Sequence, residues 1–461
     1  MRRKIQTCID RERDFGVEEL FFSTTDRRGV ILSGNDVFVR VSGYDESELI
    51  GQPHSKIRHP DMPASVFRVF WDTIQADQPI AAYVKNRAQT GEYYWVMAVA
   101  TPIVDGYLSV RVKPTSELLP IVSDVYARVL ADEQAASDEG LSKDAIIEVG
   151  LASLTKELHD LGFADYPALM HHALASEMTR RQDTLKQRKS NSHHWASHAF
   201  ASGHQSSPIS QLANANRECD RNLADMLAEL SSLNESNDSF LQSCHTMRQL
   251  SASISTVALN AQVAATTRTL EAIAGELAAA EKDTREQIVE LLDQVNNVRS
   301  SLTTLSFDIC VAALQSEIAT HFLNQIQITE SSSATEHLEL LLRQSDEKLQ
   351  TLFGGLERAE NWFQEIAKST SHLQRNAKIL RFIRMAGVTE AALLPPEHAF
   401  GGLFDRVKSS ITSLLEICET LRTDTQRCES EIRNLNALKT TLSSNLQRVR
   451  IEKTSLGTVL S

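Results

Sequence analysis

The chain has 461 residues, a formal net charge of −13 and a pI near 5.6. This length predicts several domains, and a hydrophobic fraction of 42% is that of a globular protein. The acidic balance argues against a nucleic-acid-binding surface, which would be basic. The N-terminus lacks a signal-peptide pattern and no apolar run is long enough to span a membrane. We therefore expect a cytoplasmic protein without a membrane span.

Cysteine and histidine spacing gives no sign of a metal site. The six cysteines are scattered and form no Cys-x-x-Cys pair, as expected of small apolar residues in a reducing compartment. His194 and His198 are four residues apart, a spacing that could chelate a metal on a helix. The surrounding stretch is polar and loop-like, however, and predicts a solvated linker.

Turn and strand signals in the first quarter of the chain predict an α+β domain. Residues 1–17 read as a charged N-terminal cap. The expected elements that follow are a hairpin over 20–31, helices over 35–41 and 64–76, and strands over 80–85, 92–100 and 107–113. Five strands with intervening helices indicate a five-stranded antiparallel sheet with flanking helices.

The densest cluster of chemically committed residues lies between positions 41 and 71. Six short motifs appear in order, namely VSGY (41–44), GQPH (51–54), IRHPDMP (57–63), Trp71, VKN (84–86) and Tyr94-Trp95. In sequence and spacing they resemble the PAS domain of bacterial aerotaxis receptors, over residues 18–115. The resemblance implies the PAS fold and a noncovalently bound FAD whose redox state is sensed.

The same resemblance assigns Arg58, His59 and Asp61 to flavin binding. The chemistry is reasonable, because an arginine presents a rigid fork of donors that can hold a diphosphate. A haem ligated by His54 or His59 is the alternative cofactor. The stretch between Cys8 and Cys219 holds no cysteine, so the light-driven cysteine adduct of some flavin-binding PAS proteins is not expected.

Four further residues are candidates for the cofactor site. Trp71 and Trp95 could stack on or wall the ring system, with core packing as the alternative. Asn86 offers both a donor and an acceptor, which complements the pyrimidine edge of a flavin; a turn or strand-edge position is its alternative. Asn35 is a candidate of the same kind.

Beyond residue 115 the sequence becomes helical. Residues 116–208 form a His-rich connector with helices expected over 118–132, 146–158 and 166–181. Residues 209–394 contain no proline, as long helices require. Apolar residues then recur in heptads, at 219, 226, 233, 240, 247, 254 and 261 and in two later seams, 288–326 and 411–449.

Two segments of this region resemble the hairpin tip of methyl-accepting chemotaxis proteins. Residues 254–277 match at Ala258-Leu259-Asn260-Ala261, and residues 383–407 match at Glu390-Ala391-Ala392. We expect two antiparallel hairpins, 209–330 and 331–461, forming a coiled-coil four-helix bundle within one chain. The tips depart from the family, with Ala264 and Thr267 in place of its Glu and Arg and prolines in the second turn.

These observations leave two functional hypotheses. The first is a soluble redox or oxygen sensor in which a PAS-bound flavin alters a chemoreceptor-like bundle. Its partners would be signalling proteins, with divergent forms of the chemotaxis kinase and coupling protein as candidates. The chain could also assemble as a homodimer. The second is a scaffold protein with a cofactor-free PAS dimerisation module. No P-loop or other nucleotide-binding motif occurs, so we do not expect an enzyme.

Overall fold

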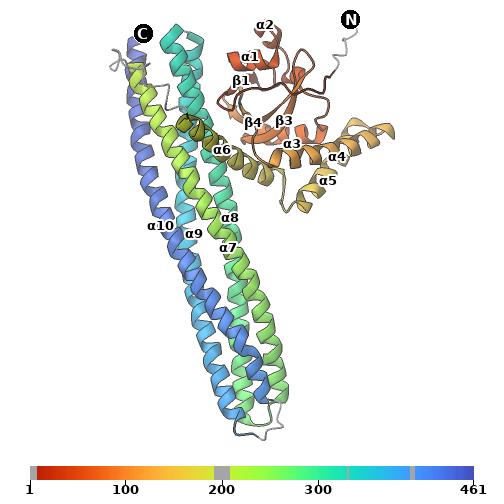
Figure 1. Ribbon diagram of the computed structural model, residues 1–461, viewed down its shortest axis with the longest axis vertical. Helices are drawn as coiled ribbons and strands as arrows, with labels where there is room; N and C mark the ends of the chain where they lie inside the picture. Colours follow the sequence, from red (N-terminus) through yellow and green to blue (C-terminus); the bar gives the residue numbers. More distant parts are fainter. Residues whose placement is uncertain (1–7, 192–207, 330–331, 395–399, 461) are drawn as a thin grey trace. The chain divides into compact units, whose positions relative to one another are not determined.

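The computed structural model describes residues 8–191, 208–329, 332–394 and 400–460, and Figure 1 shows the order of the elements. Contacts divide the chain into two compact units. The first comprises residues 1–227, 306–350 and 441–461, and the second comprises 228–305 and 351–440. The predicted His194 and His198 pair lies outside the described residues.

The first unit contains a five-stranded antiparallel sheet in the order β2-β1-β5-β4-β3. Its strands are β1 (Phe21–Asp26), β2 (Ile31–Gly34), β3 (Ile80–Arg87), β4 (Tyr93–Ile103) and β5 (Gly106–Val112). The predicted fold class is therefore confirmed. The β1–β2 turn uses Gly29 at φ 79°, where a Cβ would lie 2.7 Å from the Trp71 ring, so this position needs glycine for conformation and for space.

Side chains alternate between two faces of this sheet. One face, called here the inner face, carries Phe21, Ser23, Ala82, Asn86, Tyr94, Ala98, Ser109 and Arg111, as the strand register shows. The other, the outer face, carries Phe22, Tyr83, Trp95, Met97 and Val110. Both faces are largely buried, so each is covered by other elements.

Short helices cover the inner face. They are α1 (Asp36–Ser42), α2 (Glu46–Leu49), the 3₁₀ helix η1 (His54–Ile57) and α3 (Ala64–Gln75). The N-terminus of α3 has no cap of its own. Glu133 of helix α4 (Leu118–Asp138) supplies one, because its carboxylate accepts the backbone N–H groups of Ala64 and Ser65, each at 2.8 Å.

Helices α4 (Leu118–Asp138), α5 (Lys143–Asp160) and α6 (Tyr166–Asn191) occupy the predicted connector. Tyr126 of α4 packs 6.4 Å from Trp95 on the outer face. Glu177 of α6 is 1% exposed and accepts hydrogen bonds from the Tyr83 hydroxyl at 2.6 Å and from the backbone and hydroxyl of Ser116. Helix α6 therefore holds the outer face at the point where β5 leaves the sheet.

Four long helices complete the chain, α7 (Pro208–Ala264), α8 (Arg268–Thr329), α9 (Ser332–Ala391) and α10 (Phe400–Leu460). α7 and α8 are consecutive in the chain, as are α9 and α10. In the first turn the Thr267 hydroxyl accepts the N–H of Leu270 at 3.3 Å and so begins α8. Most of the second turn, residues 395–399, is outside the described residues.

In the second unit each long helix contacts the next. Ser251 of α7 donates to Glu281 of α8 at 3.0 Å, and Gln287 of α8 contacts His372 of α9. Asn436 of α10 donates to Glu360 of α9 at 3.1 Å, and Ser232 of α7 donates to Glu431 of α10 at 2.5 Å. The described heptad residues of the predicted seams are buried, except Leu446, which is half-buried. The two hairpins thus form a four-helix bundle within one chain.

One segment of α8 departs from the heptad pattern. Every residue from 305 to 316 is buried, including polar Asp308, Gln315 and Ser316. A helix that is apolar all round is one covered on all sides. By length and composition α8 could also cross a membrane. However, 78% of its 18-residue apolar stretch is buried inside the structure, as in the core helix of a bundle.

A buried carboxyl group lies beside this segment. Asp220 of α7 accepts from the Thr320 hydroxyl at 3.4 Å, and burial, with nearby Glu317, raises its pKa to about 7 from an ordinary 3.8. The folded state therefore holds a proton that the unfolded chain has lost between about pH 4 and 7.

We predict that Asp220→Asn removes a pH dependence of stability. In the wild-type protein the contribution of protonated Asp220 to stability is complete below about pH 4. It is lost as pH rises toward 7, at up to about 1.4 kcal/mol per pH unit. Urea unfolding at pH 5 to 8 should show that the free energy of unfolding of the asparagine variant rises relative to that of wild type as the pH increases. Asp238, which is 64% exposed, serves as the control for the same substitution. If the difference in free energy of unfolding between wild type and variant stays constant over this pH range, the prediction is contradicted.

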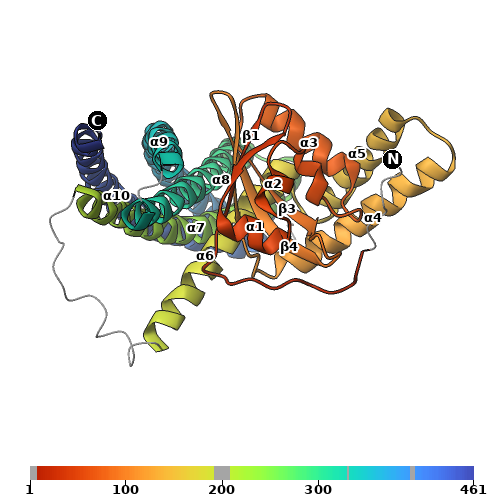
Figure 2. The same ribbon diagram turned by 90° about the horizontal axis from the view of Figure 1, so that it is seen from above.

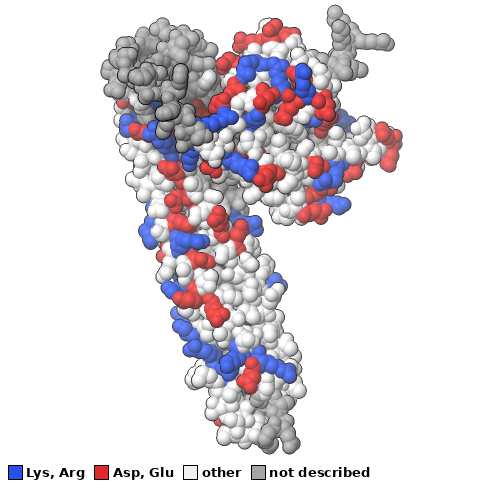
Figure 3. Space-filling view, in the orientation of Figure 1, with Lys and Arg blue, Asp and Glu red and all other residues white. Residues whose placement is uncertain are grey.

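Charges of both signs are interspersed over the face of the molecule shown in Figure 3. Acidic and basic side chains alternate along the visible helices and over the sheet domain. On this face the described residues therefore present no large field of one sign.

Candidate functional site

Arg58 closes the turn that leads into α3. Its Nη2 donates to the carbonyl oxygens of Met62 and Pro63 at 2.8 and 3.1 Å, and its guanidinium lies 3.9 Å from the centre of the Phe67 ring. Burial lowers the pKa of this arginine. The Arg58 backbone also pairs with Asn86 of β3. Arg58 thus fixes the RHPD segment against the edge of the sheet.

His59 and Asp61 lie together beside the same edge. His59 is 4% exposed, and its Nδ1 accepts the backbone N–H of Asp61 at 3.2 Å. Burial lowers the pKa of His59, so the ring is neutral at pH 7. The Asp61 carboxylate is exposed and pairs with the Lys85 amine at 2.6 Å. The aspartate therefore points toward solvent.

Asn86 belongs to the inner face, and Trp71 of α3 packs against that face. Asn86 is 2% exposed, and its Nδ2 is buried with no hydrogen-bond partner among the described residues. The Trp71 ring is half-buried and lies 5.8 Å from that of Tyr107, edge to face, at the β5 end of this surface. These two predicted residues share a surface with each other.

The structure does not bring Asn35 and Trp95 to that surface. The Asn35 Oδ1 accepts the N–H groups of Phe22 and Phe38 at 3.0 and 3.1 Å, and its Nδ2 donates to the Leu20 carbonyl at 2.7 Å. Asn35 is the N-cap of α1 and is committed to the backbone. Trp95 lies on the outer face against α4, which corresponds to its core-packing alternative.

Sequence reasoning missed the most unusual residue of the inner face, Arg111. It is 3% exposed, and its guanidinium donates to the Ser23 hydroxyl at 3.1 Å and lies 2.6 Å from the His54 Nε2. No carboxylate pairs with it within the described residues. A buried cation without an acid partner is uncommon, because desolvation is not offset.

Tyr94 completes the group. Its hydroxyl is buried without a partner among the described residues, and in the strand register Tyr94 lies directly opposite Asn86. We call Asn86, Tyr94, Arg111 and His54 the inner-face polar cluster. The sequence did carry a signal for Arg111, a charge in the apolar run YLSVRV at the same parity as inward-facing Ser109.

The electrostatics of the cluster are set by one cation. Burial and the adjacent Arg111 lower the pKa of His54 to about 3, so His54 is neutral and its Nε2 accepts from the guanidinium. Burial lowers the pKa of Arg111 to about 10, which leaves it charged at pH 7. Burial also raises the pKa of Tyr94, so its hydroxyl keeps its proton and remains a donor.

The geometry bears on the haem alternative. A haem iron needs a histidine nitrogen with a free lone pair. The Nε2 of His54 is engaged by Arg111 and the Nδ1 of His59 by the Asp61 backbone. Ligation by either of these atoms would first require that a buried hydrogen bond be broken.

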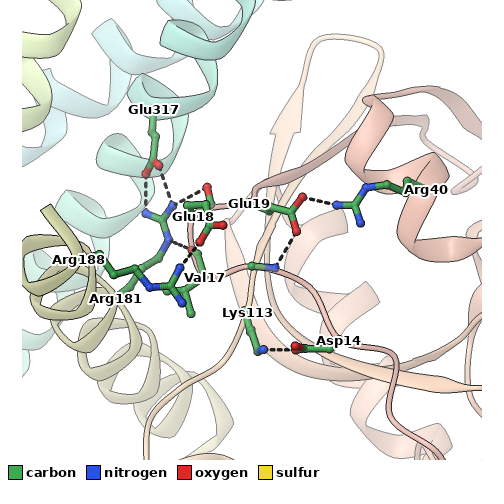
Figure 4. A network of polar contacts seen from close by, with 10 residues as sticks. Asp14, Val17, Glu18, Glu19, Arg40, Lys113, Arg181, Arg188 and Glu317 are labelled. Atoms are coloured by element: carbon green, nitrogen blue, oxygen red, sulfur yellow. Dashed lines mark hydrogen bonds and ion pairs between the residues drawn. The ribbon is translucent and has the colours of Figure 1, made fainter. Parts of the chain in front are cut away.

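A second set of contacts in the first unit joins the sheet domain to α8 (Figure 4). Arg181 of α6, 2% exposed, donates to both Glu317 oxygens at 2.7 Å and to the Val17 carbonyl at 2.9 Å. The ring of Phe22 meets Phe322 of α8 at 5.0 Å. Figure 2 shows the sheet beside α8 at this point. These contacts lie directly after the α8 segment that departs from the heptad pattern, and His171 of α6 stacks on Phe307 inside that segment at 4.0 Å between ring centres.

Comparison with known proteins assigns the sheet domain. The PAS fold family matches residues 31–110. The aerotaxis receptor of Escherichia coli (strain K12) is 45% identical over 109 residues, 23% of this chain and 22% of that protein. The nitrogen fixation regulatory protein of Klebsiella pneumoniae is 29% identical over 83 residues, 18% of this chain and 17% of that protein.

Among solved structures, the light-state blue-light photoreceptor Aureochrome1 LOV is 20% identical, with a TM-score of 0.20, and the match covers 25% of this chain and 90% of that one. The N-terminal region is a PAS domain, and the helical region after it is consistent with a chemoreceptor-like signalling region. The chain spans about a fifth of the length of the two curated relatives.

Proposed function

We propose that this chain is a cytoplasmic, non-enzymatic sensor whose PAS domain binds FAD and whose four-helix bundle transmits the redox state of that flavin. Similarity to an aerotaxis receptor over the PAS domain supports the class of sensor. The bundle built from two chemoreceptor-like hairpins supports the class of output.

The inner-face polar cluster is the observation that carries the cofactor proposal. Among the described residues, Asn86 and Tyr94 each bury a polar atom without a partner, and Arg111 buries a charge without an acid. Each such donor costs roughly 1–3 kcal/mol when left unpaired. A ligand rich in acceptors would satisfy all three donors at once, and the isoalloxazine ring of a flavin has carbonyl and ring-nitrogen acceptors along one edge.

The surroundings of the cluster fit a planar ring. Ala82, Ala98 and Ala100 place small side chains in the middle of the inner face. Trp71 and Phe38 stand over the same face from the helices that cover it. A bound flavin supplies reversible electron transfer, while these residues bind it, orient it and exclude water.

Two tryptophans provide a matched test. We expect Trp71→Leu to weaken flavin binding about tenfold or more, because base and ring stacking is worth about 1–3 kcal/mol. Trp95→Leu, a change of equal size on the outer face, should leave the affinity within about threefold of wild type while lowering stability. Fluorescence titration of the flavin-free protein with FAD gives both dissociation constants.

Asn86→Leu should also weaken binding, since it removes donor and acceptor together at nearly constant volume. A purified wild-type protein that shows no flavin absorbance after reconstitution with FAD would contradict the proposal. In that event the cofactor-free scaffold, with its PAS domain as a dimerisation module, becomes the better description.

The proposed output path runs through α6 and α8. A ligand shifts a conformational equilibrium only through contacts that differ between the two states. The Arg181 contact with Glu317 and the Phe22 contact with Phe322 are such candidates, because they join the PAS domain to a bundle helix. The downstream partners proposed are signalling proteins, among them divergent relatives of the chemotaxis kinase and its coupling protein.

A further inference from the structure

Arg111 occupies a position at which only a negatively charged ligand offsets its burial. It lies on β5, in the middle of the sheet, and its partners Ser23 and neutral His54 supply acceptors but no charge. An arginine has five N–H donors, and three contacts are made to these two residues. Donor capacity remains, and no charge in the described part of the chain compensates that of the guanidinium.

The neighbouring groups point the same way. Tyr94, Asn86 and Arg111 are all donors on one face, and carboxylates are absent from the described part of that cluster. His54 stacks on Phe38, 5.9 Å between ring centres, and holds the guanidinium through its Nε2. The cation is therefore fixed in direction before any ligand arrives, which reduces the cost of binding.

We propose that the pair Arg111–His54 is a charge-recognition site for the reduced form of a flavin ring, and that it sets the redox preference of the domain. This inference rests on the proposed function. On reduction the neutral oxidised ring accepts two electrons from a chemical reductant and one proton from solvent, and the ring then carries one negative charge. That charge interacts with a fixed guanidinium in a dry environment, where such interactions are strong.

The consequence is a difference between oxidation states. The oxidised ring is neutral, so Arg111 contributes only hydrogen bonds to it. The reduced ring gains a charge–charge interaction as well. Removal of the Arg111 charge should therefore lower affinity for reduced flavin far more than affinity for oxidised flavin, and it should make the bound flavin harder to reduce.

The test compares Arg111→Gln and Arg111→Lys with wild type, using riboflavin and FAD as probes. Riboflavin lacks phosphate, so it separates recognition of the ring from recognition of the diphosphate. We expect Arg111→Gln to shift the oxidised-to-reduced affinity ratio about tenfold for both probes, equal to about 30 mV for a two-electron couple. Arg111→Lys keeps the charge and should shift the ratio less than Arg111→Gln does.

Arg28→Gln removes the same charge at a side chain that is 83% exposed and should leave the ratio unchanged. Circular dichroism melting of each flavin-free variant checks folding. His54→Gln, which keeps an acceptor for Arg111, replaces any variant that does not fold. This substitution should shift the affinity ratio in the same direction as Arg111→Gln, because it mispositions the guanidinium. Equal losses for both oxidation states, or a shift seen with FAD but not riboflavin, would overturn the inference while leaving flavin binding intact. Failure of wild type to bind either probe would instead overturn the proposed function, and the inference with it.

Discussion

Replacement of Glu177 by alanine is expected to destabilise the first unit by about 4 kcal/mol, at the upper end for a single substitution. The Glu177 carboxylate accepts from the Tyr83 hydroxyl, from the Thr115 N–H at 2.5 Å and from the Ser116 N–H at 2.9 Å. The alanine variant leaves the Thr115 and Ser116 N–H groups without this acceptor, and the Tyr83 hydroxyl keeps the Ser116 hydroxyl at 3.1 Å. It also removes one of the contacts that join α6 to the segment that follows β5, although Arg180 of α6 still donates to the Thr115 carbonyl at 3.2 Å. Urea unfolding followed by tyrosine and tryptophan fluorescence measures the loss.

Two control substitutions separate the causes. Glu177→Gln keeps one acceptor oxygen but turns an NH₂ group toward the donors, so we expect about half the loss. Glu117→Ala removes a carboxylate from the same linker, but its side chain is 88% exposed and pairs with Arg180, so the effect should be below about 1 kcal/mol. A similar loss at Glu117 and Glu177 would contradict the assignment of a buried clamp.

The second large effect is expected at Arg181. Its guanidinium joins α6 to Glu317 of α8 and to the backbone of Val17, and it is 2% exposed. Removal of one partner from a buried ion pair costs about 3–5 kcal/mol. Glu317 is 35% exposed, and solvent screening brings our expectation to about 2–3 kcal/mol for Arg181→Ala.

Arg188 is the matched control for this substitution. It lies on the same helix and pairs with Glu18, but both side chains are more than half exposed. Arg188→Ala should therefore cost less than about 1 kcal/mol. Hydrogen exchange should show where stability is lost. We expect faster exchange of α8 residues 306–323 in the Arg181 variant only. Equal exchange in the two variants would show that Arg181 does not hold α8.

The repeating parts of the fold were predictable from local pattern. The five strands, α3 and the four long helices each follow from periodicity and from the placement of proline and glycine. The α8 segment from 305 to 316 was not recognised, because its burial depends on residues far away in the sequence, such as His171, which stacks on Phe307. A loss of heptad periodicity inside a long helix was the available signal.

The candidate site likewise contains residues that the sequence predicted and residues that it did not. Asn86 was chosen for its donor and acceptor and Trp71 for stacking, and the structure places Asn86 on the inner face and Trp71 of α3 against that face. Trp95 faces the other way because it is one residue out of phase with Tyr94 and Val96, a parity that fixes the face of every strand residue. Arg111 was missed because its significance depends on what is absent around it, and sequence alone does not reveal the lack of an acid partner.

Hydrogen exchange of α8 in the oxidised and reduced protein tests the central claim most directly. The protein loaded with FAD is compared before and after reduction by dithionite, with the flavin absorbance recorded in parallel. We predict a change of about threefold or more in the exchange of residues 306–323, and loss of that change in Arg181→Ala. Identical exchange in both states, with the absorbance showing full reduction, would mean that the PAS domain does not signal through this helix.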